Sequence, residues 1–248
     1  MLNQRQNTIL KILEGNNLTS VNELSSILKV SSVTIRQDLN FLESQGLLKR
    51  VHGGAMLRDA DDISNRLGNN YEKKLRIAKK LTEYVNDGET ILIESGSVNA
   101  LFARELVNRK KVTIITTNVY IARQFRKTEK ANIIILGGFY QHESESLVGK
   151  ITKLCIDNIN FEKAFIGIDG YDKTSGFTSR DLFRAEISGH IIKKAREVFI
   201  VSDSSKFGKT ELTNICLVSD VSFIATDTDL ANEYWQEFSI PGLNLILA

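Results

Sequence analysis

The sequence VSSVTIRQDLNFLESQG (residues 30–46) places its apolar residues at the spacing of one face of an α-helix. Ile35, Leu39 and Leu42 recur at positions i, i+4 and i+7, so together they form a stripe that a hydrophobic core can bury. The rest of the helix surface is polar near its start. That polar side carries Ser32, Thr34, Arg36, Gln37 and Asn40.

The flanking segments complete a helix-turn-helix pattern. Ser20 and Glu23 have the spacing of a capping box at the start of a preceding apolar helix, and Ser31 or Ser32 then begins the quoted helix after a short turn. A shorter apolar helical pattern comes before both. The segment LLKRVHGGAML (residues 47–57) alternates around a Gly-Gly pair, as a β-hairpin does. Three helices followed by a hairpin is the order of a winged helix-turn-helix.

The polar side of the quoted helix has the side chains that recognise DNA. Arginine pairs with guanine through two hydrogen bonds, glutamine and asparagine do so with adenine, and serine and threonine reach phosphates or base edges. Lysine and arginine in the hairpin are suited to phosphates. A solvated helix face is the alternative. We predict contact with double-stranded operator DNA through Ser32, Thr34, Arg36, Gln37, Asn40, Lys49 and Arg50.

Composition limits the class of protein. A hydrophobic content of 42% and a charged content of 25% are typical of a folded globular protein. The net charge is +2, and residues 1–58 hold 7 Lys/Arg against 4 Asp/Glu, a weak excess that agrees with a nucleic-acid contact without demanding one.

No apolar run approaches the ~18 residues that span a bilayer, so we expect a cytoplasmic protein. Cys155 and Cys216 are isolated among apolar residues, which predicts buried reduced thiols and neither a metal site nor a cofactor.

Residues 72–248 alternate strand-like apolar runs with helical patterns. The runs are TILIES (90–95), VTIITT (112–117), NIIILGG (132–138), KAFIGIDG (163–170), EVFIVSD (197–203), VSFIATD (221–227) and NLILA (244–248). Strands that are apolar throughout and separated by helices predict a mostly parallel α/β sheet. We therefore predict a winged helix-turn-helix at 1–57, a polar linker without regular structure at 58–71, and a Rossmann-like α/β domain at 72–248 that opens with an amphipathic helix at 71–85.

Small and polar residues follow several of these runs, at the edge where open α/β sheets bind ligands. The loop before the helix at residue 98 could hold a phosphate with its backbone N–H groups and two hydroxyls, and a lysine after a later strand could supply a cation. The alternatives are a plain capped helix and a solvated lysine; Arg180 and Asp181 could bind sugar hydroxyls or merely begin a helix. The candidate ligand-binding residues are Ser95, Gly96, Ser97, Asn118, Gly138, Asp169, Gly170, Arg180, Asp181 and Lys206.

The motifs resemble those of DeoR-family bacterial transcriptional regulators. The first domain carries S-x-x-T-I-R-x-D-L-x-x-L-E-x-x-G followed by R-x-H-G-G-A, and the second carries ESGS, TTN, LGG, FIGIDG, GFTS and VSDSSKFG in the family's order. The resemblance implies a sensor domain that shares its fold with ribose-5-phosphate isomerase, glucosamine-6-phosphate deaminase and CoA transferases, and that serves for effector sensing and oligomerisation. It also implies homo-oligomers, dimeric or tetrameric, that bind operators near sugar-catabolic genes.

By position, the resemblance implies roles for individual residues. Arg36 falls in the recognition helix, the loop at 95–97 and Lys206 fall on the phosphate, and Asp169 and Asp181 fall near the sugar. One departure concerns the phosphate loop, which usually reads Asp-Ser/Ala-Gly-Ser/Thr-Thr in the family. Here Val98 replaces the last threonine, so one hydroxyl is lost.

The sequence thus predicts a transcriptional regulator, a repressor of sugar-metabolism genes whose operator affinity is controlled by a phosphorylated sugar. One rival is a sugar-phosphate isomerase or transferase with an accessory DNA-binding domain. It lacks a supporting motif, because no GxSxG, HExxH or P-loop pattern and no convincing nucleophile with its base is present, and we predict no catalytic residue. The other rival is an architectural DNA-binding protein whose second domain only oligomerises.

Overall fold

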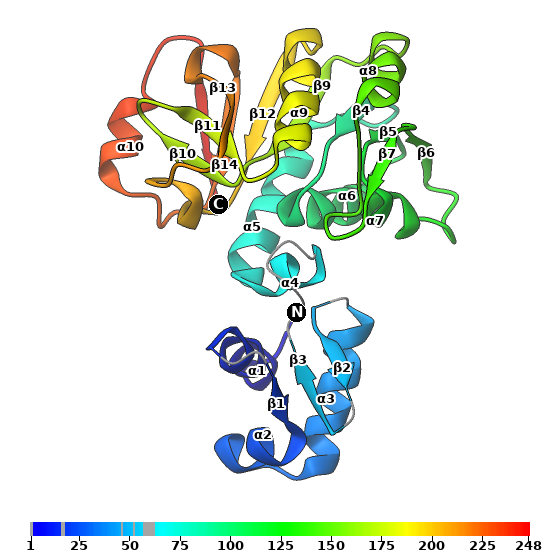
Figure 1. Ribbon diagram of the computed structural model, residues 1–248, viewed down its shortest axis with the longest axis vertical. Coiled ribbons are helices and arrows are strands. Elements are labelled where there is room, and N and C mark those ends of the chain that lie inside the picture. Colours follow the sequence, from blue (N-terminus) through cyan, green and yellow to red (C-terminus); the bar gives the residue numbers. More distant parts are fainter. Residues whose placement is uncertain (1, 16–17, 46, 52, 57–62) are drawn as a thin grey trace. The chain divides into compact units, whose positions relative to one another are not determined.

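The computed structural model describes residues 2–15, 18–45, 47–51, 53–56 and 63–248. The chain forms two compact units, Met1–Tyr71 and Glu72–Ala248. The described residues of the first unit up to residue 56 form three helices and a small sheet (Figure 1). These elements are α1 (Gln4–Gly15), β1 (Thr19–Ser20), α2 (Val21–Leu28), α3 (Ser32–Ser44), β2 (Lys49–Val51) and β3 (Gly54–Met56).

Helix α3 forms as its apolar spacing predicts. Ile35, Leu39 and Leu42 are fully buried, and the Ser31 side chain caps the helix by accepting a hydrogen bond from the backbone N–H of Thr34 at 3.2 Å. A buried acid adds a link that the apolar pattern does not reveal. Asp38 accepts hydrogen bonds from Arg5 Nε at 2.5 Å and from Gln6 Nε2 at 3.0 Å, which join α3 to α1.

The small sheet contains one strand more than the predicted hairpin. β3 lies between β2 and β1, and all pairs are antiparallel. Gly54 permits the additional pairing, because a Cβ atom at this position would lie 2.5 Å from the Thr19 carbonyl oxygen. β1 has only two residues and no apolar pattern, which explains why the sequence did not predict it.

The segment predicted to be an unstructured linker contains a helix. Residues 58–62 of that segment lie outside the described residues, but α4 spans Ile63–Gly68. Ile63 and Leu67, one helical turn apart, are both buried, so this short segment has an apolar stripe of its own. The amphipathic helix that follows is α5 (Tyr71–Leu81), and it ends in a 3₁₀ turn, η1 (Thr82–Tyr84), within the predicted range 71–85.

All seven predicted strands are present and form one parallel sheet in the second unit. They are β4 (Thr90–Ile93), β5 (Val112–Thr116), β6 (Ala131–Ile135), β9 (Lys163–Gly167), β12 (Glu197–Val201), β14 (Phe223–Thr226) and β15 (Asn244–Leu247). Their order is β15-β14-β12-β9-β4-β5-β6, and every neighbouring pair is parallel. The predicted α/β class, with a helix-turn-helix and a mostly parallel sheet, is confirmed.

The strand order reverses at β4. From β4 the chain adds β5 and β6 on one side, then returns to place β9 on the other side and continues outward to β15. Because the sheet is parallel, the carboxyl ends of all seven strands lie at one edge. The crossover connections diverge from the boundary between β4 and β9, and a crevice at such a switch point is where open sheets of this kind bind ligands.

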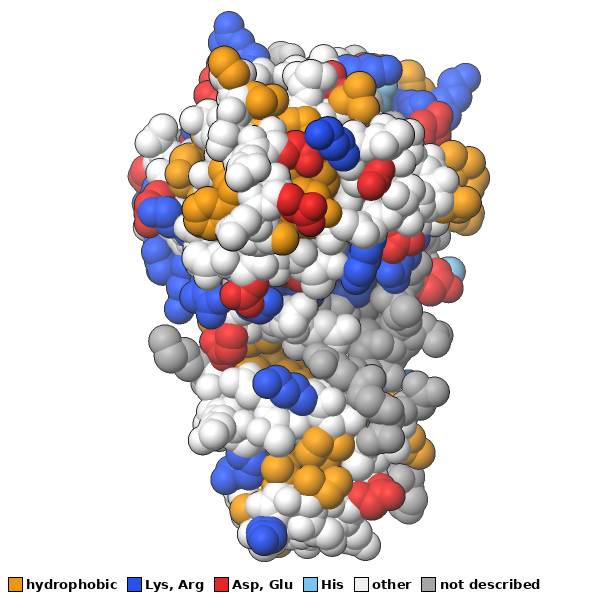
Figure 2. Space-filling view, turned by 90° about the vertical axis from the view of Figure 1, so that its left-hand side faces the viewer, with side chains coloured by type: hydrophobic (Ala, Val, Ile, Leu, Met, Phe, Trp, Pro, Cys, Tyr) orange, Lys and Arg blue, Asp and Glu red, His pale blue; other side chains and the backbone are white. Residues whose placement is uncertain are grey.

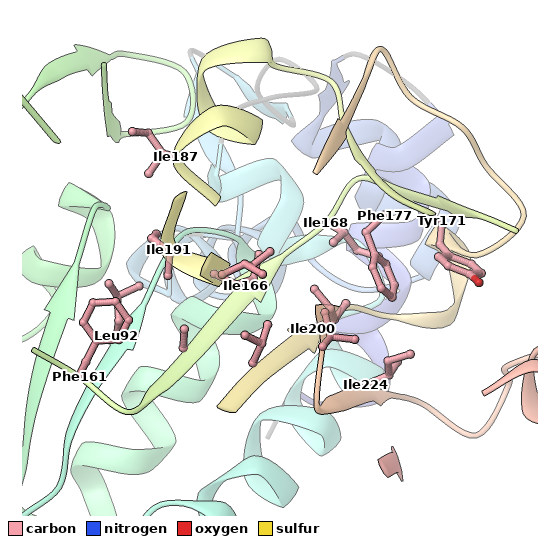
Figure 3. Packing of buried hydrophobic residues seen from close by; sticks show 14 of the residues in the cluster. Leu92, Phe161, Ile166, Ile168, Tyr171, Phe177, Ile187, Ile191, Ile200 and Ile224 are labelled. Carbon is pink, nitrogen blue, oxygen red and sulfur yellow. The ribbon is translucent and has the colours of Figure 1, made fainter. Parts of the chain in front are cut away.

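The inner strands are apolar throughout because helices cover both faces of the sheet there, whereas the edge strand β6 leaves Ile134 and Ile135 39% and 46% exposed. On one face, α8 (Lys150–Asp157) and α9 (Leu182–Lys194) contribute to a cluster in which Ile187 and Ile191 lie near Leu92 and Ile166 (Figure 3). The other face carries a row of aromatic rings. Their centroid distances are 4.5 Å for Phe102–Phe165, 4.6 Å for Phe165–Phe199 and 4.2 Å for Phe199–Phe223, where Phe102 belongs to α6 (Ser97–Arg109).

Short antiparallel strands and helices complete the second unit. They are α7 (Val119–Arg123), β7 (Phe139–Gln141), β8 (Ser146–Val148), β10 (Gly170–Asp172), β11 (Gly176–Ser179), η2 (Ser204–Lys206), β13 (Thr213–Cys216), η3 (Val218–Asp220) and α10 (Asn232–Glu237).

Cys155 and Cys216 are free thiols, as predicted, but they are partly and not fully buried. Burial raises the pKa of Cys216 to about 12. None of the described helices is long and apolar enough to span a bilayer. The described residues contain no cluster of metal-binding side chains.

We expect Phe199→Ala to destabilise the second unit by ~3–5 kcal/mol, because the fully buried ring stacks on two neighbours and its removal leaves a cavity. Phe183→Ala is a matched control, since Phe183 is 53% exposed on the same unit and its loss should cost less than about 0.5 kcal/mol. Urea denaturation followed by circular dichroism measures both. Equal midpoints for the two variants would contradict the packing described above.

Candidate functional site

The polar side of α3 places the predicted DNA-contacting residues at the surface. Arg36, Gln37 and Asn40 are exposed, and Ser32 and Thr34 are half-buried in the first turn. The Thr34 hydroxyl lies 2.9 Å from the Ser31 hydroxyl, so part of its hydrogen-bonding capacity is already used inside the protein.

The hairpin residues lie beside the same helix face. The Asn40 side-chain oxygen accepts a hydrogen bond from Arg50 Nη1, and the Arg50 backbone N–H donates to Glu43 Oε1 at 2.8 Å. Lys49 is exposed. The structure therefore brings α3 and β2 together, and it shows Asn40 and Arg50 bonded to each other.

Charge alone does not identify this surface. Residues 1–58 hold 7 Lys/Arg against 4 Asp/Glu, which is only a small positive excess. Figure 2 shows the side of the N-terminal unit that lies on the left in Figure 1, away from α3; on that side the lysine and arginine side chains are separated by other residue types. The argument for DNA contact depends on the exposed helix and its particular side chains. It does not depend on a strong electrostatic field.

The predicted phosphate loop lies at the switch point of the sheet. Ser95, Gly96 and Ser97 follow β4, and the side chains of both serines are buried. Gly96 is the N-cap of α6 and has a φ of 111°, a value that favours glycine; among the described residues no side chain caps this helix. The first backbone N–H groups of α6 are consequently not bonded to a capping side chain, which suits an anion.

The end of β9 closes against this loop. A Cβ atom at Gly167 would lie 2.7 Å from the Ser95 carbonyl oxygen, so only glycine allows the approach. Asn99, the third residue of α6, donates from its side-chain nitrogen to the carbonyl oxygens of Ser95 at 2.9 Å and Phe165 at 3.0 Å. Asn99 is thus a positioning residue that sequence reasoning missed, because its partners lie in the loop after β4 and on β9.

A buried glutamate lies beneath the phosphate loop. Glu94 accepts hydrogen bonds from the Ser95 hydroxyl at 2.8 Å and from the Gly167 backbone N–H at 3.3 Å. Burial raises the pKa of the Glu94 carboxyl, although these hydrogen bonds and the positive charge of Arg184 act in the opposite direction. The ionised form of Glu94 is therefore disfavoured in the folded protein.

Asp169, the residue predicted to bind the sugar, lies just after β9, two residues beyond Gly167. Its carboxylate is buried and accepts hydrogen bonds from the Ser179 hydroxyl at 3.3 Å and from the Arg180 backbone N–H at 3.2 Å. Arg184 Nη2 lies 3.7 Å from Asp169 Oδ2. Arg184 is buried and was missed by sequence reasoning, since nothing in a helix pattern distinguishes it from a solvated arginine.

Arg180 and Asp181 have other partners in this structure. The Arg180 side chain is exposed and donates from Nε to Glu211 Oε1 at 2.9 Å. Asp181 caps α9 by accepting from the backbone N–H of Arg184 at 2.7 Å, and its other oxygen accepts from Gln141 Nε2 at 2.9 Å. Of the alternatives left open for Asp181, the helix start is the one that the structure shows.

Three further predicted ligand residues support the backbone around the edge. Asn118 caps α7, and its amide donates to the Ser144 carbonyl oxygen at 2.9 Å. Gly138 and Gly170 each allow a close approach, because added Cβ atoms would lie 2.0 Å from Thr152 Oγ1 and 2.5 Å from the Lys209 carbonyl oxygen, respectively. These contacts explain why the fold has asparagine at position 118 and glycine at positions 138 and 170, even if no ligand contacts them.

Lys206 ends η2, the turn that follows β12. β9 is the single strand between β12 and β4, so the ends of β12 and β4 are separated by ~10 Å, twice the usual strand spacing. A lysine side chain can reach across much of that distance. The phosphate loop, Asp169 and Lys206 therefore lie at one edge on adjacent or nearly adjacent strands.

Comparison with known protein families matches both units of the chain. Residues 5–60 match the DeoR-like helix-turn-helix domain, and residues 69–228 match the DeoR C terminal sensor domain. The chain is 30% identical to the HTH-type transcriptional regulator GolR of Listeria innocua over 99% of this chain and 98% of the relative. It is 31% identical to the glycerol-3-phosphate regulon repressor of Escherichia coli over 90% of each protein, and 31% identical to the HTH-type transcriptional regulator IolR of Bacillus subtilis over 88% of each.

Solved structures with a related arrangement were also found. Ribose 5-phosphate isomerase A from Methanocaldococcus jannaschii aligns with 56% of this chain and 55% of that chain, at 24% identity and a TM-score of 0.42. The translation initiation factor eIF-2B of Pyrococcus horikoshii aligns with 89% of this chain and 86% of that chain, at 12% identity and a TM-score of 0.46.

We expect Glu94→Gln to stabilise the protein progressively more as the pH rises from about 4 to about 7. Above the ordinary glutamate pKa the unfolded chain loses the Glu94 proton, whereas folding raises this pKa and disfavours ionisation, so wild-type stability declines with pH until the folded pKa is passed. Melting temperatures of both proteins across this range measure the difference. Glu162→Gln, at an exposed glutamate, is the control; a constant difference for Glu94→Gln would contradict the raised pKa.

Proposed function

The chain belongs to the DeoR family of helix-turn-helix transcriptional regulators, and we propose that it represses genes of sugar metabolism and is controlled by a phosphorylated sugar. Family membership makes it a DNA-binding regulator and not an enzyme. Under this proposal α3 enters the major groove of the operator, and the effector binds at the switch point of the parallel sheet. The effector then changes operator affinity.

One observation carries the sensing part of the proposal. The uncapped start of α6, the buried hydroxyls of Ser95 and Ser97, and Asp169 lie at the carboxyl ends of the two strands where the sheet order reverses. A phosphate suits the helix start, since backbone N–H groups and the helix dipole both favour negative charge there. A buried carboxylate beside it is a suitable acceptor for sugar hydroxyls.

The names of relatives support the effector class and the direction of control. They include a glycerol-3-phosphate regulon repressor of Escherichia coli and a lactose phosphotransferase system repressor of Lactococcus lactis, the latter 29% identical over 95% of each protein. Both names describe repression of genes for sugar or polyol use. We propose the same type of regulation for this chain, at the residues named above.

We also propose that the protein acts as a homo-oligomer, a dimer or a tetramer. Each chain supplies one recognition helix, and a twofold dimer presents two such helices to a palindromic site with half-sites about one helical turn apart. Arg36 and Gln37, both exposed on α3, are the residues that we assign to base contact. Lys49 in the hairpin is assigned to a phosphate.

A thermal-shift screen tests the sensing proposal. The panel contains phosphorylated pentoses, hexoses and glycerol 3-phosphate, each with its unphosphorylated counterpart as a control. A compound present at 100 times its dissociation constant should stabilise the protein by ~2.7 kcal/mol. If no phosphorylated compound stabilises the protein or changes its affinity for DNA, the sensing proposal is wrong and a constitutive architectural role is favoured.

We expect Arg36→Ala to weaken operator binding by ~1–3 kcal/mol, because Arg36 is exposed on α3 and arginine reads guanine through two hydrogen bonds. The DNA is a duplex that the wild-type protein selects from a random pool, and fluorescence anisotropy at fixed salt gives the affinity. Lys11→Ala, at an exposed basic residue of α1, is the control. Wild-type affinity in Arg36→Ala would remove Arg36 from the list of base contacts.

We expect Lys206→Ala to leave operator affinity unchanged and to weaken effector binding at least tenfold, which corresponds to ~1.4 kcal/mol for a lost phosphate contact. The panel compound with the largest thermal shift is titrated by calorimetry against the wild type and the variant. Lys209→Ala removes an exposed lysine three residues away and is the control. Normal effector binding with impaired DNA binding would contradict this role for Lys206.

A further inference from the structure

Two lysines at the start of α5 contact carboxylates at the ends of β12 and β14. Lys74 is only 3% exposed, and its Nζ lies 3.7 Å from Asp203 Oδ2. Lys73 Nζ lies 3.4 Å from Asp227 Oδ1 and 2.7 Å from Asp229 Oδ2. Asp203 and Asp227 are both buried, so two acidic side chains at the sheet edge each have a cation supplied by the same helix.

The same two carboxylates also hold the turn that carries Lys206. Asp203 Oδ1 accepts hydrogen bonds from the Ser205 backbone N–H at 3.2 Å and the Ser205 hydroxyl at 2.5 Å. Asp227 accepts from the Ser204 backbone N–H at 2.7 Å and the Ser204 hydroxyl at 2.9 Å. Each carboxylate is therefore bonded to α5 on one side and to η2 on the other.

Burial makes the ion pair between Lys74 and Asp203 costly to break. A buried lysine that loses its partner is left as an uncompensated charge, which is far more costly than breaking an exposed ion pair. Burial alone would raise the pKa of Asp203, but the charge of Lys74, the hydrogen bonds from Ser205 and the charge of Lys206 together hold it below its usual value. Asp203 is thus ionised at neutral pH and pairs with the Lys74 ammonium.

Helix α5 begins where the DNA-binding unit ends, so a change in these ion pairs can affect that unit. α5 begins at Tyr71, the last residue of the DNA-binding unit, and Lys73 and Lys74 lie in its first turn. Any shift of that turn is transmitted along the backbone toward the DNA-binding unit within a few residues. A shift of η2 moves Asp203 and Asp227 or breaks their bonds, and buried Lys74 and partly buried Lys73 either follow or lose these partners.

We infer that Lys73 and Lys74 are positioning residues that couple the effector site to the DNA-binding unit through Asp227 and Asp203. The inference rests on the proposed function, since it assumes that a phosphorylated compound binds near Lys206. Such a compound competes with Asp203 for Lys206 and displaces η2. The displacement is then transmitted to the first turn of α5 by the two buried carboxylates.

The double variant Lys74→Met/Asp203→Asn separates coupling from binding. It removes both buried charges together, so that neither is left unpaired, and asparagine retains a side-chain oxygen that can accept from Ser205. Lys80→Met is the matched control, because Lys80 lies on the same helix but is exposed and pairs with Glu83. Thermal melts establish that each variant is folded before the comparison.

Hydrogen–deuterium exchange then measures binding and transmission separately. Intact protein is examined with and without the panel compound that gives the largest thermal shift, and with inorganic phosphate as a second probe. In the wild type and in Lys80→Met we expect the compound to change exchange in residues 203–207 and in residues 71–78. In the double variant we expect the change at 203–207 to remain and the change at 71–78 to become clearly smaller, because only the Lys73–Asp227 pair is left to transmit it.

Operator affinity provides the functional readout. A coupled regulator typically changes affinity about 5- to 150-fold with effector, and we expect a clearly smaller change in the double variant than in the wild type and in Lys80→Met. A double variant that transmits the change to residues 71–78 and responds like the wild type would overturn the inference. So would a wild type whose residues 203–207 respond while residues 71–78 do not. A wild type with no response at 203–207 instead overturns the proposed effector site, and the inference with it.

Discussion

The contact between Gly167 and the Ser95 carbonyl oxygen is the constraint on which the proposed sensor site depends. The strand order reverses between β4 and β9, and these two strands must end side by side for a crevice to open there. The Cβ atom of any side chain at residue 167 would clash with the Ser95 carbonyl oxygen. Gly96 has a positive φ, a backbone conformation that favours glycine. The two glycines therefore bring the uncapped start of α6 against the end of β9, where Asp169 follows two residues later.

Much of this architecture could be predicted from the sequence, because the relevant signals are local. Seven runs of apolar residues became seven strands, since helices cover both faces of the inner part of the sheet. The spacing of Ile35, Leu39 and Leu42 likewise indicated α3 and the side that faces solvent. Segment 63–68 was mistaken for a linker, because two apolar residues in six give too short a pattern for a helix to be recognised.

The site was only partly predictable, because its charged residues act through partners that are distant in sequence. Lys74 and Arg184 look like ordinary helix-surface residues until their burial beside Asp203 and Asp169 is seen. Arg180, which the loop pattern favoured, is exposed and paired with Glu211. The choice between neighbouring arginines on a strand-to-helix turn depends on which one the fold directs inward, and that information is tertiary.

The charge balance at the sheet edge explains why a phosphate could act as a signal there. Buried carboxylates at Asp169, Asp203 and Asp227 already engage the cations near them, and Glu94 is disfavoured as an anion by its burial. Under the proposed function, an incoming phosphate adds negative charge beside these pairs, and it gains one of their cations only by weakening an existing pair. Part of the binding free energy of the phosphate then goes into rearranging carboxylate contacts. Two of those carboxylates, Asp203 and Asp227, are paired with lysines of α5. A sensor with additional unpaired cations would bind phosphate more tightly. Its existing ion pairs would then stay intact, so binding would cause a smaller conformational change.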